Sequence, residues 1–281
     1  MPIFLLLLLL VLLGLFLYWQ LVIAEGAYLG RRVVALLYDL VAKRYNDIKQ
    51  YMPETDEQYL SRPLVLSLVG TPHPLVLDVA TGTSRLPLTL CQQPLFDGQI
   101  MALDNARRML HEATNYVAAY RDRVTWVWQH AVPLPFAADT FDAVTCLEAL
   151  EFMPGTTQAL QECVRVLKPG GLLVVTNRVG SGRRFMPGKT FSQEKFEALL
   201  QTLGQSEVTT QVWQIDYDLV WSIKPGADRP LLIHNDYPLN PIDLLRCPQC
   251  GGRLDQAKES LTCRSCGRHY PIGSDGVIEF L

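Results

Sequence analysis

Residues 74–88 read PLVLDVATGTSRLPL, and this stretch decides the fold that we predict for the chain. A short apolar run leads to Asp78, small residues follow at 80–84, and a helix-compatible run comes next. An apolar run bounded by turn signals is typical of a buried parallel strand. A tight turn at its carboxyl end lets a ligand approach the N–H groups at the next helix start. The stretch predicts an α/β sheet with a nucleotide-type ligand; a strand–turn–helix without special function is the alternative.

A second apolar stretch, Gln99–Asp104, also ends in an acid and precedes a helix-compatible run. In open α/β sheets, an acid about 20 residues beyond the glycine turn reaches the ribose hydroxyls of a nucleotide. Asp104 lies 22 residues after Gly82, which fits that spacing. The alternative is a surface aspartate that caps the helix beginning near Ala106.

Two later stretches complete the pattern: PLPFAADTFDAVTCLEALEFMP at 133–154 and VLKPGGLLVVTNR at 166–178. Together with the first two, they resemble the class I S-adenosylmethionine-dependent methyltransferases, most closely the ubiquinone/menaquinone C-methyltransferases and related "type 11" domains. The resemblance covers about residues 38–224. It implies an α/β fold with a Rossmann-like, seven-stranded sheet, in a methyltransferase domain at 54–224 that binds S-adenosylmethionine.

The resemblance also implies which residues contact the cofactor. The stretch YDLVAKRYN at 38–46 is similar to the family's helix that closes over the cofactor, so we expect residues 25–53 to form an amphipathic lid. A helix lying on a membrane surface is the alternative reading of this segment. His130 stands where the family usually has an acid that contacts the adenine amine. The expected cofactor residues are Tyr38, Tyr45, Asp78, Ala80, Thr81, Gly82, Ser84, Asp104, Asn105, His130, Ala131 and Leu147.

Two turn positions that are glycine in the family are Ala80 and Ser84 here. Alanine at the first position is normal for the quinone-methyltransferase branch. A residue with a Cβ atom tolerates positive φ poorly, so Ser84 either weakens cofactor binding or contacts the methionine carboxylate through its hydroxyl. A non-catalytic domain that only binds the cofactor is therefore an alternative function.

The expected fourth strand, Ala143–Cys146, is followed by Glu148 and Glu151. We predict that these two carboxylates lie near the transferred methyl group; charges that favour a helix N-terminus are the alternative. The sulfonium is already a strong methyl donor, so the protein mainly aligns donor and acceptor. A base matters only if the acceptor arrives protonated.

The N-terminal stretch Ile3–Ile23 is apolar and uncharged. Its 21 residues would span roughly 31 Å as a helix, which matches a bilayer core of about 30 Å. We predict a single-pass membrane anchor at 1–24; a cleaved signal peptide is the alternative. Basic residues follow the stretch and none precedes it, so the positive-inside rule places the catalytic domain in the cytoplasm. An anchored enzyme suggests a small or lipid-soluble acceptor.

Near the C-terminus the chain reads CPQCGGRLDQAKESLTCRSCG, with two C-x-x-C-G motifs. Four thiolates from two such motifs suit one structural Zn²⁺; two disulfides are the alternative. The metal ligands would be Cys247, Cys250, Cys263 and Cys266. This zinc ribbon, expected at 244–281 beyond a Pro-rich linker at 225–243, resembles the small proteins that activate methyltransferases of tRNA and translation factors. The resemblance implies that the ribbon docks in cis on the methyltransferase domain and stabilises it.

The charge pattern argues against nucleic acid as a partner. The formal net charge is −3, and no long basic run occurs, so the electrostatic signature of nucleic-acid binding is missing. The sequence therefore favours a membrane-anchored methyltransferase with a lipid-soluble acceptor. Methylation of tRNA or of a protein is the alternative enzyme function.

Overall fold

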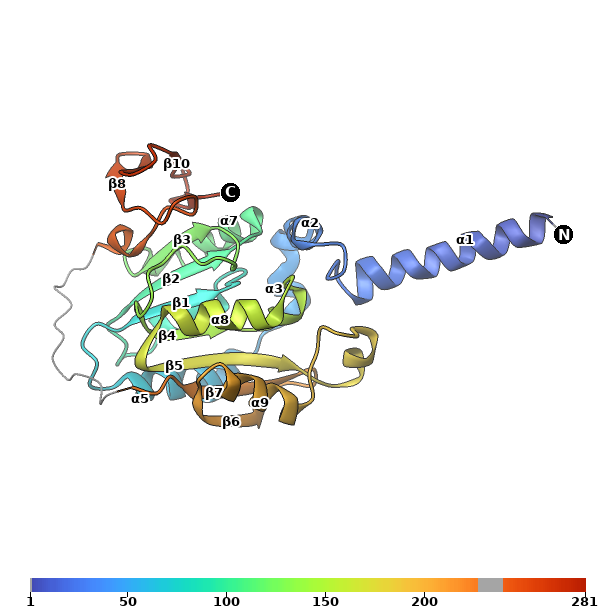
Figure 1. The fold of residues 1–281 in the computed structure, drawn as a ribbon, viewed down its shortest axis with the longest axis horizontal. Coiled ribbons are helices and arrows are strands. Elements are labelled where there is room, and N and C mark those ends of the chain that lie inside the picture. Colours follow the sequence, from blue (N-terminus) through green and yellow to red (C-terminus); the bar gives the residue numbers. More distant parts are fainter. Residues whose placement is uncertain (1, 227–239) are drawn as a thin grey trace.

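The computed structural model describes residues 2–226 and 240–281, and its centre is an eight-stranded sheet with the order β11-β3-β2-β1-β4-β5-β7-β6 (Figure 1). The first seven strands along the chain are β1 (Leu75–Val79), β2 (Gln99–Asp104), β3 (Val124–Trp128), β4 (Phe141–Cys146), β5 (Leu167–Arg178), β6 (Ser206–Val212) and β7 (Tyr217–Ile223). Strands β1 to β5 are parallel, and β7 runs antiparallel between β5 and β6. These seven strands form the sheet that the sequence predicts.

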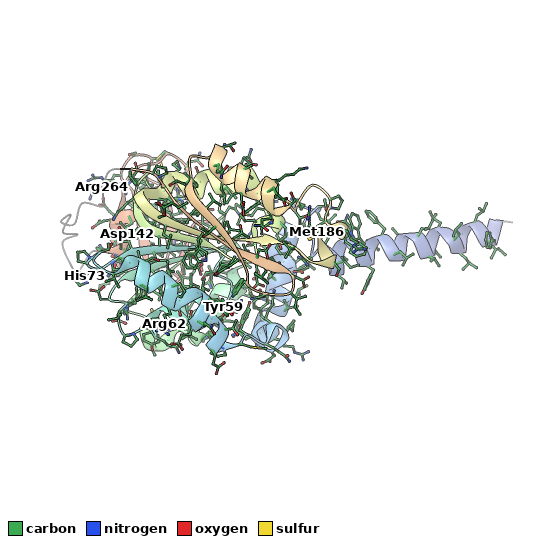
Figure 2. The ribbon with its side chains drawn as sticks, turned by 90° about the horizontal axis from the view of Figure 1, so that it is seen from below. Tyr59, Arg62, His73, Asp142, Met186 and Arg264 are labelled. Carbon is green, nitrogen blue, oxygen red and sulfur yellow. The ribbon has the colours of Figure 1, made fainter. Side chains whose placement is uncertain are left out.

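Helix α1 (Pro2–Tyr18) projects away from the rest of the molecule (Figure 2), and the π-helical turn η1 (Trp19–Ile23) joins it to the domain. Residues Ile3–Ile23 form a helix long and apolar enough to cross a membrane by length and composition, and 6% of its most apolar window is buried. Signal sequences near an N-terminus can have the same length and apolar composition. The apolar side chains of α1 thus lack a protein partner within the described chain.

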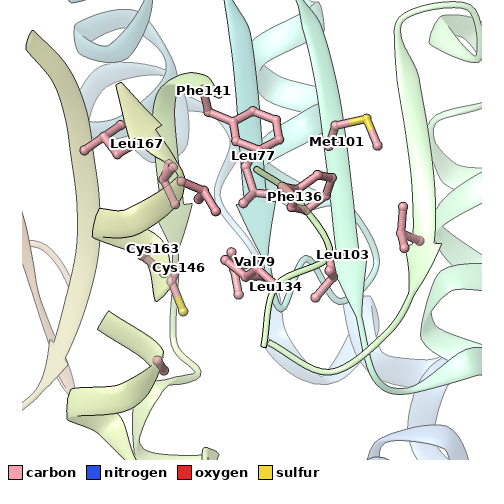
Figure 3. Close-up of a cluster of buried hydrophobic side chains, with 14 of the residues drawn as sticks. Leu77, Val79, Met101, Leu103, Leu134, Phe136, Phe141, Cys146, Cys163 and Leu167 are labelled. Carbon is pink, nitrogen blue, oxygen red and sulfur yellow. The ribbon is translucent and has the colours of Figure 1, made fainter. Parts of the chain in front are cut away.

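The two faces of the sheet carry separate apolar clusters. Leu77 and Val79 of β1 pack toward α8 (Thr156–Val166) and α9 (Gln193–Thr202), in the cluster shown in Figure 3. Val76 faces the opposite way, toward α5 (Arg62–Leu68), α6 (Arg85–Cys91) and α7 (Arg107–Tyr116). Because both faces are covered, β1 is buried at every position, which explains its continuous apolar run.

The expected lid helix is divided into short pieces. They are α2 (Arg31–Val41), the 3₁₀ turn η2 (Ala42–Arg44) and α3 (Tyr45–Lys49). The last piece ends at Gln50, which adopts the left-handed conformation that commonly closes a helix. The lid expected at 25–53 is therefore a bent segment rather than one continuous helix, and it wraps the end of the sheet.

Residues 53–68 form one helical segment, in which α4 (Pro53–Asp56) and a π-helical turn η3 (Glu57–Ser61) lead into α5. Pro63 stands just after the π-helical turn, as is common where a proline removes an intrahelical hydrogen bond. Residues 168–171 lie within β5, where the β4–β5 register shifts between Phe141 and Ala143.

The C-terminal ribbon is a three-stranded sheet in the order β10-β9-β8. Its elements are η7 (Pro241–Leu244), β8 (Leu254–Ala257), β9 (Ser260–Cys263) and β10 (His269–Pro271). The last strand, β11 (Ile278–Glu279), leaves the ribbon and pairs in parallel with β3. Ribbon residues such as Leu245 and Leu261 share one apolar cluster with β1 and β4. Most of the linker expected at 225–243, namely 227–239, lies outside the described residues.

Candidate active site

Two neighbouring cavities lie at the carboxyl ends of the parallel strands, under the lid segment. The large cavity is lined by residues of α2, of the turns after β1 and β2, and of the segments after β3 and β4. The expected cofactor residues in its wall are Tyr38, Tyr45, Ala80, Gly82, Asp104, Asn105, His130, Ala131 and Leu147. The small cavity is lined by Asp78, Thr81, Tyr51 and Arg85, among others, and shares Tyr45, Ala80, Gly82, Leu147 and Glu148 with the large one.

Asp104 joins the ends of β1 and β2. One carboxylate oxygen, Oδ2, accepts a hydrogen bond from the Gly82 N–H at 2.8 Å, and Oδ1 accepts one from the Ala106 N–H at 2.8 Å. Gly82 has a φ of +56°, a conformation that glycine adopts without strain. Burial raises the pKa of Asp104 to about 6. The acid at the end of β2 and the turn after β1 thus meet at one point in the cavity wall, as their spacing predicts.

Asp78, in β1, fixes the turn after β1 through a hydrogen bond with Thr81. Its carboxylate accepts hydrogen bonds from the hydroxyls of Thr81 and Thr145, both at 2.6 Å. Burial raises the pKa of Asp78 to about 6. The two hydroxyls fix the carboxylate between β1 and β4, where it forms part of the small cavity wall.

Ala80 and Ser84 both occupy the left-handed region, with φ values of 57° and 63°. A side chain with a Cβ atom is strained there by roughly 1–2 kcal/mol. The Ser84 hydroxyl is wholly buried and accepts a hydrogen bond from the Trp126 indole N–H at 2.9 Å. Ser84 is absent from the linings of both cavities, so the expected contact between its hydroxyl and the cofactor is corrected: the hydroxyl binds Trp126 instead.

His130 lies in the wall of the large cavity, after β3. Its Nδ1 atom is buried and has no hydrogen-bond partner among the described residues. Burial, together with the charges of Arg31 and Arg32, lowers the pKa of His130 to about 4. The ring is therefore neutral at physiological pH and can accept a hydrogen bond through a nitrogen that now lacks one.

The lid segment is held over the cavities by polar contacts. The Tyr38 hydroxyl donates to Glu25 at 2.8 Å, and the rings of Tyr38 and Tyr45 lie 5.9 Å apart. The Thr83 hydroxyl donates to the Asn46 side-chain oxygen at 2.6 Å. The lid is thus fastened directly to the turn after β1.

Glu148 lines both cavities and is the better placed of the two candidate catalytic carboxylates. It accepts hydrogen bonds from Lys49 of the lid at 2.7 Å and from Arg85 at 2.8 Å. Burial disfavours its ionisation, but the charges of Lys49 and Arg85 outweigh that effect and lower the pKa of Glu148. Arg85 also binds Asp56 and stacks on the Tyr51 ring at 3.8 Å.

Glu151 lies behind the cavity wall. It is 2% exposed and accepts hydrogen bonds from the Tyr217 hydroxyl at 2.5 Å and from Arg178 at 3.3 Å. Burial raises the pKa of Glu151. Because Glu151 is not among the residues that line either cavity, the structure does not bring the two carboxylates to one surface.

The sequence interpretation missed the cations of the site, Lys49 and Arg85. Lys49 reaches Glu148 from 99 positions away, and Arg85 reaches it from 63. No local motif marks such partners. The one usable signal was the position of Arg85, directly after the turn of small residues.

The four cysteines of the ribbon come together as expected. Their sulfur atoms all lie within 4.8 Å of one another, with Cys247–Cys266 at 3.7 Å and Cys250–Cys263 at 3.5 Å. These separations exceed the disulfide bond length of about 2.05 Å. Tetrahedral zinc with Zn–S bonds of about 2.3 Å needs sulfurs roughly 3.8 Å apart. The arrangement therefore fits a four-thiolate zinc site.

Comparison with known proteins gives two family matches. The methyltransferase-domain family matches residues 76–171, and the Trm112p-like protein family matches residues 242–274. The demethylmenaquinone methyltransferase of Thermobifida fusca is 30% identical over 200 residues, which cover 71% of this chain and 75% of that protein. The same enzyme of Symbiobacterium thermophilum is 34% identical over 140 residues, covering 49% and 56%.

Among solved structures, the [4+2]-cyclase SpnF matches with a TM-score of 0.56 and 21% identity, over 70% of this chain and 96% of that one. The strand order, with one antiparallel strand near the edge, and the acid of β2 beside the turn of β1 define the class I methyltransferase fold. The chain belongs to the S-adenosylmethionine-dependent methyltransferases related to the ubiquinone/menaquinone C-methyltransferases, with a Trm112p-like region at its C-terminal end. It spans 55–60% of the length of the first three curated relatives that it matches.

Proposed function

We propose that this protein is a membrane-anchored methyltransferase that transfers a methyl group from S-adenosylmethionine to a lipid-soluble, quinone-like acceptor. The observation that carries the proposal is the hydrogen bond of 2.8 Å between Asp104 and Gly82. It supports a cofactor site because an acid at the end of β2 and a small-residue turn after β1 are the two elements that bind a nucleoside in such sheets.

The residues of the two cavities suit the parts of the cofactor. In our proposal Asp104 accepts hydrogen bonds from the ribose hydroxyls, beside Asn105. The free Nδ1 atom of His130 accepts one from the adenine amine, beside Ala131. The small cavity takes the methionine part, since Arg85 suits its carboxylate and Asp78 suits its ammonium group. The remaining contacts come from Tyr38, Tyr45, Ala80, Thr81, Gly82 and Leu147.

S-adenosylmethionine supplies a methyl group already activated on a sulfonium, so the chain mainly has to align it with the acceptor. Glu148 is ionised and lines both cavities. We place it beside the acceptor, where a carboxylate accepts the proton of an acceptor hydroxyl. Glu151 acts in this proposal as a positioning residue, because it holds Tyr217 and Arg178 behind the cavity wall.

The acceptor class is inferred from α1 and from the relatives. The relatives carry names of methyltransferases in menaquinone and ubiquinone biosynthesis, whose acceptors are apolar. A single membrane span at α1 would keep the cavities near such molecules, with the catalytic part in the cytoplasm as the basic residues after the span suggest.

The ribbon, in our proposal, binds one Zn²⁺ through four cysteines and stabilises the methyltransferase domain in cis. Glu279 of β11 pairs with Trp128 of β3, and the Phe280 N–H donates to the Trp128 carbonyl at 3.0 Å. The Trp128 indole N–H in turn donates to the Asn105 carbonyl at 3.0 Å. The ribbon tail therefore supports the strand end from which Gln129 and His130 enter the cavity wall.

Isothermal titration calorimetry with S-adenosylmethionine tests the cofactor site. We expect one binding site with a dissociation constant of about 1–100 µM, a range typical of enzyme substrates. Asp104→Ala removes two charge-assisted hydrogen bonds and is expected to weaken binding roughly 100-fold. Asp97→Asn, an exposed acid just before β2, is the matched control and should bind normally. Normal binding by Asp104→Ala would contradict the proposed site.

A further inference from the structure

The segment after β5 connects the end of α1 to the wall of the large cavity. The Trp19 indole N–H donates to the Phe185 carbonyl at 2.9 Å, and the Tyr28 hydroxyl donates to the Pro187 carbonyl at 2.8 Å. Met186, between them, is fully buried and lies beside the domain end of α1 (Figure 2). The segment 181–189 is therefore packed on the residues that follow α1.

The same segment also contacts the wall of the large cavity. The Lys189 ammonium donates to the Met153 carbonyl at 2.8 Å, and Met153 and Pro154 line the large cavity. Arg31, at the start of α2, is also in the cavity wall. The parallel strands end on the side of the sheet from which α1 projects (Figure 1). The segment that follows α1 thus contributes Arg31 to the cavity wall, and the segment 181–189 contacts that wall at Met153.

The segment that follows α1, taken as residues 26–38, and the segment after β5, taken as residues 177–193, carry basic residues and no acidic ones. Arg31, Arg32 and Arg184 are exposed, Arg183 is half-buried, and none of the four forms an ion pair with another described residue. Two large apolar side chains stand among them, Leu29 with 45% and Phe185 with 48% exposure. We call these six residues the basic face.

We propose that the basic face rests on the anionic lipid headgroups around α1, so that the large cavity opens at the membrane surface and its acceptor enters from the lipid. Exposed arginines attract anionic headgroups, and apolar side chains between them enter the interface. The inference rests on the proposed function in one respect, namely that α1 spans the bilayer. It adds a second membrane contact, and a route for the acceptor, that an anchor alone does not provide.

Hydrogen exchange of the full chain in lipid nanodiscs tests the basic face. One sample uses phosphatidylcholine alone, and the other replaces 30% of it by phosphatidylglycerol. We expect exchange of the amides at 181–188 to slow roughly tenfold with the anionic lipid, since each arginine near the surface adds to the attraction. The slowing should disappear in 1 M salt, where charges are screened beyond about 3 Å.

The variant Arg183→Gln/Arg184→Gln should lose this slowing, whereas Arg264→Gln, on the ribbon, should keep it. Equal exchange in the two lipids, or an unchanged slowing in the double variant, would overturn the inference. The proposed cofactor site would survive that result, because S-adenosylmethionine binding is measured separately on the same samples. A chain that does not stay in the nanodiscs would overturn the anchor, and this inference with it.

Discussion

Arg107 of α7 holds Asp275 of the ribbon through two hydrogen bonds of 2.9 Å each. A third contact, of 2.8 Å, joins Arg107 to Glu279 of β11. Burial acts to raise the pKa of the Asp275 carboxyl, but its hydrogen bonds with Arg107 and His111 and the charge of Arg107 outweigh that effect and lower the pKa to about 2. Arg107 lies two positions after Asn105, so the ribbon tail is tied to the wall of the large cavity.

Arg107→Ala is expected to lower the free energy of unfolding by about 1–2 kcal/mol, because Glu279 loses its cation and Asp275 keeps only His111 as a side-chain partner among the described residues. The affinity for S-adenosylmethionine should fall at the same time, since the start of α7 is then less well fixed. Thermal unfolding and calorimetry measure the two effects. The control Arg264→Ala removes a solvent-exposed ion pair with Asp255 and should change neither the unfolding temperature nor the affinity for the cofactor. If Arg107→Ala also left both quantities unchanged, the coupling between the ribbon tail and the cavity wall would be contradicted.

Removal of zinc is expected to loosen the ribbon, since structural four-thiolate sites supply folding free energy. Once the ribbon is unfolded, β11 no longer pairs with β3. The apparent Tm should then fall by about 5–10 °C, as a loss of a few kcal/mol implies for a chain of this size. The Tm is measured before and after treatment with a chelator. The amount of zinc that the chelator releases per protein chain is measured on the same sample. Added zinc should restore the Tm, and an unchanged Tm after full release would refute the structural role.

The pH dependence of cofactor binding follows from Asp104 and Asp78. Burial raises the pKa of each carboxyl to about 6 in the free protein, and the proposed contacts with the ribose and the ammonium group use the ionised forms. Binding must therefore release up to two protons below that pH, so the dissociation constant should rise by up to about a hundredfold per pH unit below about 6 and stay flat above it. Calorimetry from pH 5 to 8 measures this slope. Asp104→Asn should bind more weakly and lose the part of the slope due to one proton, whereas an equal slope in the variant would assign the titration elsewhere.

The free Nδ1 atom of His130 predicts how the adenine is recognised. A neutral ring with an unpaired acceptor favours a ligand that carries an amine there. S-adenosylhomocysteine should therefore bind more tightly than S-inosylhomocysteine, which has an oxygen in that position, by about tenfold. His130→Phe should reduce this preference while Asp97→Asn keeps it. Equal affinities for the two ligands in the unchanged protein would remove His130 from the adenine site.

The architecture could be predicted from the sequence because the signals that determine the strands and the cysteine cluster are local. The apolar runs at 74–79 and 99–104 and the spacing from Gly82 to Asp104 predict the strands and the place where they meet, and the paired C-x-x-C motifs predict the cysteine cluster. The ion pairs of Glu148 were not predictable in this way, because Lys49 and Arg85 come from distant elements. Strand β11 was missed because two residues have no periodicity, and the role of Ser84 depends on Trp126, which is 42 positions away.

Transfer of label from S-adenosylmethionine is the most direct test of the account. Membranes that contain the full chain are incubated with methyl-labelled cofactor and then separated into lipid, RNA and protein fractions. We predict that the label appears in the lipid fraction and is lost in Asp104→Ala. Label in the RNA or protein fraction, or none in any fraction despite cofactor binding, would contradict the proposed methylation of a lipid-soluble acceptor.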